Sequence, residues 1–138
     1  MVGDYGVEFN NKYRPPIYFE RKSLSDLTGT LTSGMVRFKK EIERAKEHNL
    51  TLILIIECSL TKAIEGTKYS KVDPISIIKT VFTLWVKYGI VPIFCKNRDE
   101  MALFISEYYS AIGRNAIKEF GKDWLEYKPK ESNGIQKA

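Results

Sequence analysis

The sequence predicts a single α/β domain. Short apolar runs, each of a length typical of a strand, alternate with longer segments in which apolar residues recur at helical spacing. The length of 138 residues suits one hydrophobic core, and 43% of the residues are hydrophobic, as in an ordinary globular protein. This composition excludes a chain that is disordered as a whole, and two cysteines are too few for a disulfide framework.

The N-terminal region predicts a β-hairpin followed by a helix. Residues 2–9 and 17–22 are apolar and aromatic, as strands are, and the segment 10–16 between them has the Asn and Pro content of a turn. Ser23 then opens a helix, because a serine followed three residues later by an acidic residue is a helix-start pattern.

The middle of the chain predicts two helices around a buried strand. Residues 52–56 form a continuous apolar run, which is typical of a strand covered on both faces. Asp73 and a following proline open a helix over 74–88, which ends at Gly89. The segment 34–48 is an amphipathic surface helix, because four apolar residues recur at helical spacing: Met35, Phe38, Ile42 and Ala45.

The C-terminal part predicts one more strand and one long helix. Residues 90–95 read as a strand, and Asn97 with Glu100 three residues later forms a capping-box pattern for the helix that follows. The sequence turns polar near its end, where we expect a frayed tail. We therefore expect a folded domain over residues 1–123 and a polar tail over 124–138.

Charge and hydropathy indicate the cell compartment and the kind of partner to expect. No apolar run approaches the roughly 18–20 residues needed to cross a bilayer, and the N-terminus lacks a signal-peptide pattern. We expect a protein without a membrane partner, in the cytoplasm of a prokaryote or of a virus-infected cell, or in the nucleus of a eukaryote. Cys58 and Cys95 then stay as buried free thiols. The net charge of +5 fits an anionic partner such as nucleic acid, although many other proteins share it.

Four charged residues near the N-terminus predict a hydrolytic site. Glu20 and Lys22 lie two residues apart on a strand and so share one face. A carboxylate can hold a hard divalent cation there, while a lysine orients a water molecule or offsets developing negative charge. Pairing of the hairpin brings Asp4 toward Glu20, and Asp26 in the first helical turn offers a third oxygen ligand. Magnesium-dependent hydrolysis of a phosphodiester requires such a set of oxygen ligands with a lysine nearby.

Each of these residues also has a local explanation. Asp26 fits a helix-capping position for its own sake. Glu20 and Lys22 fit a solvent-exposed pair worth a few tenths of a kcal/mol. Asp4, which follows a glycine, fits a turn. Taken one position at a time, the residues leave both explanations open.

The combined pattern carries a family resemblance. Gly-Asp, a gap of hairpin length and then E-R-K-x-x-x-D over residues 20–26 resembles the signature of the XPF-type structure-specific nuclease domain, a branch of the restriction-endonuclease-like superfamily. The similarity extends over roughly residues 2–112 and includes the strand-into-helix segment 16–27. It implies a three-layer α/β fold with a central mixed sheet flanked by helices.

The resemblance implies a Mg²⁺-dependent endodeoxyribonuclease, with Mn²⁺ as a substitute, that cuts DNA at branches, flaps or single-to-double-strand junctions in repair or recombination. By position in the motif, Asp4, Glu20 and Asp26 match the metal-site acids of the family. Lys22 matches the catalytic lysine, and Arg21 matches the motif arginine. Strand alternation points Arg21 away from Glu20, so we expect it to support the site by binding a carboxylate.

Further residues are weaker candidates. Glu57 ends a strand near a family acid, and is either a site-supporting group or a plain strand-end charge. Arg37 is either a DNA contact or part of a solvated helix face. The pattern predicts a loop over the polar segment 58–73, which either runs along the phosphate backbone of DNA or is an ordinary solvent-exposed loop. Its candidate DNA-binding lysines are Lys62, Lys68 and Lys71.

The sequence departs from the family pattern in two ways. Family members normally have an earlier strand with another acid before the Gly-Asp, whereas this sequence begins at Met1, so we expect a sheet without that strand. The chain is then either cut short or a reduced version of the domain. Nothing after residue 113 resembles the paired helix-hairpin-helix module of many relatives, which predicts a stand-alone domain.

The sequence leaves two questions open, one about a homodimer and one about catalytic activity. Aromatic residues of the two C-terminal helices either pack in the core or form a homodimer face, as in the family: Phe82, Trp85, Tyr88, Tyr108 and Tyr109. The alternative function is a catalytically inactive nuclease-like domain that binds branched DNA or serves as a partner subunit. The complete motif favours the enzyme, because non-catalytic members typically have broken motifs. A plain interaction module is the third and weakest hypothesis.

Overall fold

The computed structural model describes residues 3–9, 13–66, 71–120 and 135–137. Strands and helices alternate along most of the chain, as the hydropathy pattern predicts. In order, the elements are β1 (Tyr5–Val7), β2 (Ile17–Ser23), α1 (Leu24–Leu31), α2 (Met35–Glu47), β3 (Thr51–Glu57), α3 (Leu60–Glu65), α4 (Pro74–Tyr88), β4 (Val91–Cys95), α5 (Arg98–Phe120) and β5 (Ile135–Lys137).

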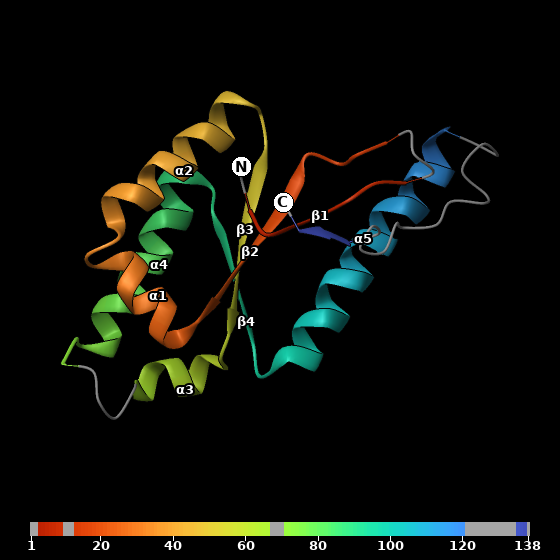
Figure 1. Cartoon of the computed structure of the whole chain (residues 1–138). Coiled ribbons are helices and arrows are strands. Elements are labelled where there is room, and N and C mark those ends of the chain that lie inside the picture. The colour runs from red at the N-terminus through yellow and green to blue at the C-terminus, as the bar shows by residue number, and fades with distance from the viewer. Residues whose placement is uncertain (1–2, 10–12, 67–70, 121–134, 138) are drawn as a thin grey trace.

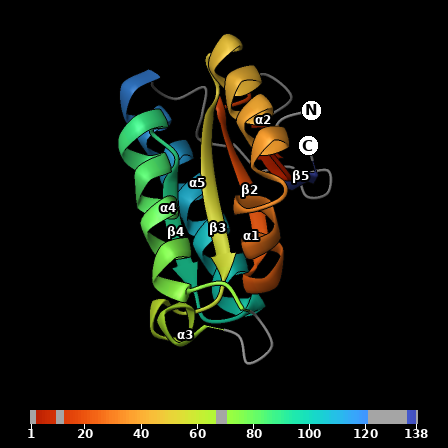
Figure 2. The same ribbon diagram turned by 90° about the vertical axis from the view of Figure 1, so that its left-hand side faces the viewer.

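The strands form one mixed sheet in the order β4-β3-β2-β1-β5. Strands β2, β3 and β4 run parallel, whereas β1 is antiparallel to both of its neighbours. Helices α1, α2 and α4 cover one face of the sheet, and α5 covers the other (Figure 1). Figure 2 looks onto the first of these faces, with α5 behind the sheet. The expected three-layer α/β fold is therefore confirmed.

Each face of the sheet has its own hydrophobic core. Strand β3 belongs to both, because its side chains alternate between the two faces. Leu52, Leu54 and Ile56 pack with the helices α1, α2 and α4, whereas Ile53 and Ile55 pack on the side of α5. All five are buried, as the continuous apolar run predicts.

The predicted helix starts and stops are present. The Ser23 hydroxyl accepts a hydrogen bond from the backbone N–H of Asp26 at the start of α1, and the Asp73 carboxylate caps α4. Gly89 ends α4 in the left-handed conformation, with φ of 71°. Asn97 accepts from the backbone N–H of Glu100 at the start of α5. These local signals fix where each helix meets the sheet.

Two segments differ from expectation. Ser59 caps a short helix, α3, by accepting from the backbone N–H of Lys62, in part of the chain that we predict to be a loop. Near the C-terminus, where we predict a frayed tail, Ile135–Lys137 pairs with β1 as β5, and the rest of that segment lies outside the described residues. An unpaired strand edge is a ready partner for another extended segment, which gives a physical reason for this pairing.

The cysteines and aromatic residues divide between core and surface. Cys58 and Cys95 are buried free thiols, as predicted, and burial raises the pKa of both. Tyr109 on α5 is 1% exposed and joins the core, whereas Trp85 and Phe82 on α4 are 44% and 40% exposed. Throughout the described segments, no helix combines the length and the apolar character needed to span a membrane.

Candidate active site

Of the side chains that the structure describes, Glu20 is the buried charged one, at 8% exposure. It lies in the middle of β2, two residues after Tyr18, which packs with the core on the side of α1 and α2. Burial, followed by the nearby charge of Asp4, raises the pKa of Glu20 from 4.5 to about 7. Lys22 opposes this rise without cancelling it. The positive charge of Lys22 is therefore too small to offset both the burial of Glu20 and the negative charge of Asp4.

Among the described residues, Lys22 is the cation that contacts Glu20. Its Nζ lies 3.6 Å from Glu20 Oε1, and its side chain is 22% exposed. The two residues share one face of β2, as strand alternation predicts. A half-buried ammonium in contact with a buried carboxylate keeps donors free on its exposed side, where a water molecule or a phosphate oxygen can approach.

Asp4 is held against the edge of β2 by its backbone and its side chain. Its N–H donates to the carbonyl of Phe19 at 2.7 Å, and its Oδ2 accepts from the backbone N–H of Arg21 at 2.9 Å. Tyr5 pairs with Phe19, so one further step of the antiparallel register places Asp4 opposite Glu20. The predicted approach of these two carboxylates is confirmed.

Gly3 makes this close approach possible. Its φ is +73°, and a Cβ at this position would lie 2.8 Å from the Cβ of Tyr18. Any other residue would be strained in its backbone and would collide with β2. The Gly-Asp pair of the motif thus has a structural cause, because the glycine lets the chain come close enough for the aspartate to bind the strand.

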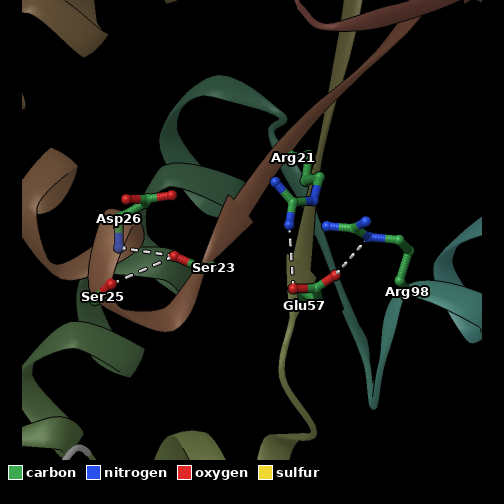
Figure 3. Close-up of polar contacts among 6 residues, drawn as sticks. All are labelled: Arg21, Ser23, Ser25, Asp26, Glu57 and Arg98. Atoms are coloured by element: carbon green, nitrogen blue, oxygen red, sulfur yellow. Dashed lines mark hydrogen bonds and ion pairs between the residues drawn. The ribbon is translucent and has the colours of Figure 1, made fainter.

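A solvent-open hollow of about 420 Å³ lies beside Lys22, between β2 and the helices α1 and α2. Asp26 borders it from the first turn of α1, where its backbone N–H is fixed by Ser23 (Figure 3). Arg37 and Glu41 border it from α2, one helical turn apart. The hollow therefore has two basic groups, Lys22 and Arg37, and two acidic groups, Asp26 and Glu41, and Lys22 joins it to Glu20.

The three predicted metal ligands are brought together only in part. Asp4 and Glu20 are neighbours, whereas Asp26 borders the hollow on α1. Within the described ranges, no three Asp, Glu, His or Cys side chains gather closely enough to hold a metal ion. Mg²⁺ nevertheless often takes only one or two carboxylates and keeps several waters. Two hard oxygen donors with an excess of negative charge fit such an ion.

Arg21 lies on the opposite face of β2 from Lys22, as predicted. Its Nη2 lies 3.1 Å from Glu57 Oε2 at the end of β3, and Arg98 Nε of α5 lies 3.7 Å from the other oxygen of the same carboxylate (Figure 3). The parallel register pairs Ser23 with Glu57 and so brings the two strand ends together. Glu57 is the carboxylate that ties β2, β3 and α5 at this end of the sheet.

The predicted DNA-contact residues that the structure describes are spread over the surface. Arg37 borders the hollow, beside Lys22. Lys62 lies on α3 with its Nζ 3.9 Å from Glu65, and Lys71 is exposed before α4. Lys68 falls outside the described residues. Of the three described residues, Arg37 is therefore the one that the structure brings to the candidate site.

Two charged residues near the candidate site were not predicted from the sequence. Glu41 contributes to the raised pKa of Glu20, and it follows Arg37 by four residues on a helix, a spacing that puts both on one side. Arg98 follows the predicted cap Asn97 and reaches Glu57. The first could have been found from helical spacing, but the second depends on how α5 meets β3.

The comparisons with known proteins agree with this geometry. The mixed sheet between helical layers, with an acid–lysine pair on β2, defines a domain of the restriction-endonuclease-like class. Within that class, the chain belongs to the ERCC4 domain family, whose model matches residues 1–108.

Two solved XPF structures are similar to this chain. XPF from Aeropyrum pernix superimposes with a TM-score of 0.60 at 25% sequence identity, over 78% of this chain and 48% of XPF. XPF from the same organism in complex with DNA matches with a TM-score of 0.54 at 25% identity, over 67% of this chain and 42% of XPF. The match thus spans about half of the XPF chain. No match was found among the curated proteins.

Proposed function

We propose that this domain is a metal-dependent DNA endonuclease that hydrolyses phosphodiester bonds at branched, flap or junction structures. The observation that carries the proposal is the contact of 3.6 Å between Lys22 Nζ and Glu20, which lies opposite Asp4 and next to a hollow bordered by Arg37. Membership of the ERCC4 family and the likeness to an XPF structure in complex with DNA support DNA as the substrate.

The proposed mechanism divides the work among the residues around the hollow. Asp4 and Glu20 hold Mg²⁺ or Mn²⁺, which supplies polarisation of the scissile phosphate when bound. Lys22 orients the attacking water through Nζ and offsets the negative charge that develops on the phosphate. Arg37 holds a neighbouring phosphate with its planar guanidinium, and Asp26 borders the same hollow as a third acid.

The substitution Lys22→Ala tests this mechanism. We expect the variant to fold and to bind flap DNA, but to lose at least about a hundredfold in cleavage rate, a loss typical of removing a proton-transfer or electrostatic group. The measurement is cleavage of labelled flap, splayed-arm and duplex DNA with Mg²⁺, Mn²⁺ or EDTA.

Lys87→Ala is the matched control. Lys87 is an exposed lysine in the last turn of α4, at the end of the sheet opposite to Lys22, and its loss removes the same charge. Equal cutting by wild type and Lys22→Ala would refute the mechanism. A well-folded wild type that cuts none of the substrates with either metal would refute the enzyme itself.

A second candidate function is an inactive nuclease-like domain that binds branched DNA or serves as a partner subunit. The observation in its favour is that no three metal-ligating side chains gather within the described residues. The two candidates differ in their affinity for divalent cations, which can be measured without any substrate.

Metal binding should stabilise the enzyme but not the inactive domain. An ion that binds the folded state at about a hundred times its Kd adds about 2.7 kcal/mol to the free energy of unfolding, which is a rise of several degrees in Tm. We expect this rise with millimolar Mg²⁺ or Mn²⁺ for wild type, and its loss in Glu20→Gln. Melting curves that do not move with either metal would favour the inactive domain.

We also propose that the domain forms a homodimer through its C-terminal helices. Helix α4 buries Ile77, Val81 and Leu84 against the sheet, yet its opposite side exposes Phe82, Trp85 and Val86. A helix that is apolar on both sides is normally covered on both sides. A second copy of the same chain is the occupant that the family resemblance favours.

A further inference from the structure

A second pocket lies on the face of β2 opposite to Lys22. It has a volume of about 360 Å³ and lies between the end of β2, the start of α5 and β1. Its polar rim consists of Arg21 and Arg98, and Tyr5 contributes an aromatic ring. Its apolar floor comes from α5: Met101, Ala102 and Ile105.

The charge of this pocket favours an anion. Arg21 and Arg98 share one carboxylate, Glu57, which leaves a local excess of one positive charge. Each guanidinium has five N–H donors, and the contacts with Glu57 use only part of them. The Arg98 side chain is 82% exposed, so it can turn toward a ligand, whereas Arg21 is held at 30% exposure.

The apolar floor favours a ligand that carries an aromatic or apolar group in addition to a phosphate. A surface that binds only the backbone of a duplex needs positive charge but no apolar cavity, because the bases are stacked inside. Proteins that bind single strands instead combine basic groups with aromatic rings on which unpaired bases stack. An arginine rim beside Tyr5 and an apolar helix face has both of these properties.

The position of the pocket relates it to the hollow beside Lys22. Arg21 and Lys22 are neighbours in β2 and point to opposite faces, so the two cavities flank the same strand end. We infer that the Arg21–Arg98 pocket holds one unpaired nucleotide of a single-stranded arm, with its phosphate on the arginines and its base against Tyr5 and Ala102. This inference rests on the proposed function, since it assigns the second arm of a branched substrate.

Ala102→Glu tests the pocket by placing a carboxylate on its floor. Ala102 is exposed on α5, where alanine and glutamate are both good helix formers. Ala111→Glu makes the same change at another exposed position of α5, two and a half turns away and on the other side of the helix. We expect Ala102→Glu to weaken binding of a fluorescein-labelled 12-nucleotide thymidine strand about tenfold, while Ala111→Glu changes it less than twofold.

Arg98→Gln is the second variant, with Arg114→Gln as its control on the same helix. Arg114 is exposed and carries the same charge. Loss of one phosphate contact to a single strand should lower the slope of log affinity against log salt by about 0.7, and only in Arg98→Gln. Thermal melting of all four variants confirms that they fold, and if Ala102→Glu does not fold, Arg98→Gln decides.

Fluorescence anisotropy in EDTA separates this inference from the proposed function. A wild type that binds the strand through Ala102 and Arg98 supports the pocket, whether or not it cuts DNA with metal. The inference would be overturned if wild type bound no single strand, or if the pocket variants bound it as tightly as wild type. Either result would leave the proposed cleavage activity unaffected. If the pocket variants weakened the binding of a 12-base-pair duplex as much as that of the single strand, the inference would also be overturned, because the pocket would then contact only phosphate.

Discussion

Glu20 is the residue on which the candidate site depends. Its carboxylate is buried in β2 opposite Asp4, and among the described residues Lys22 is the cation that contacts it, at 3.6 Å. Like charges that face one another across two strands destabilise the sheet. The folded protein therefore holds Glu20 in a place where ionisation is costly, and a bound cation would remove that cost.

This cost predicts how stability depends on pH. The pKa of Glu20 is about 7 in the folded protein, against an ordinary 4.5. Between these values the folded state keeps a proton that the unfolded chain has lost, so the free energy of unfolding falls as pH rises from about 4.5 to about 7. The whole loss is on the order of 3 kcal/mol. Glu20→Gln has no charge to bury, so in EDTA it should match wild type near pH 4.5 and exceed it by about 1–3 kcal/mol at pH 8.

Urea denaturation in EDTA at several pH values measures this difference. Glu43→Gln is the control, because Glu43 is an exposed glutamate of α2 whose replacement removes the same charge. The control should follow wild type at every pH. A difference between Glu20→Gln and wild type that stays constant from pH 4.5 to pH 8 would contradict the assigned burial of the charge.

Single residues were predictable where a local rule decides their direction. Strand alternation alone puts Glu20 and Lys22 on one face of β2 and Arg21 on the other, and all three lie as predicted. The partner of Arg21 depends on a parallel strand pair far apart in sequence, and Arg98 depends on how α5 meets that pair. Contacts of this kind follow from packing, which a single sequence does not specify.

Strand β2 organises both cavities at the scale of elements. Its middle and end deliver Glu20 and Lys22 to the side of α1 and α2, and Arg21 to the side of α5. The Ser23 cap then starts α1 directly at the strand end and so fixes Asp26 at the border of the hollow. Because side chains alternate along β2 and α1 begins directly at its end, a seven-residue motif supplies groups to both faces of the sheet.

Elements were predictable where their pattern is long, and less so where it is short. The helices α2 and α4 and the strand β3 have periodic or continuous apolar patterns, and they lie where the sequence predicts. Helix α3 has six residues, too few for a clear apolar period, so its polar segment was predicted to be a loop. Strand β5 lies in a polar segment and exists through its pairing with the edge of β1, a tertiary effect that overrides local propensity.

At the scale of the whole molecule, one part of the exposed apolar surface lies along one edge of the sheet. Strand β4 is the edge strand, and α4 next to it exposes Phe82, Trp85 and Val86. On the other side of β4, a groove of about 540 Å³ runs along α5 and is lined by apolar residues such as Leu103 and Phe104. An exposed strand edge with apolar surface on both sides favours association.

The proposed homodimer predicts the effect of a charge in this surface. Val86 is 87% exposed on α4, and Val86→Glu would place a carboxylate inside a dimer interface without a partner. Val36→Glu makes the same change on α2, where Val36 is 71% exposed and away from the β4 edge. Sedimentation velocity at tens of micromolar should show wild type and Val36→Glu at twice the 15.9 kDa of one chain, and Val86→Glu near 15.9 kDa. Wild type that sediments as a monomer would instead mean that another partner, or none, covers this edge.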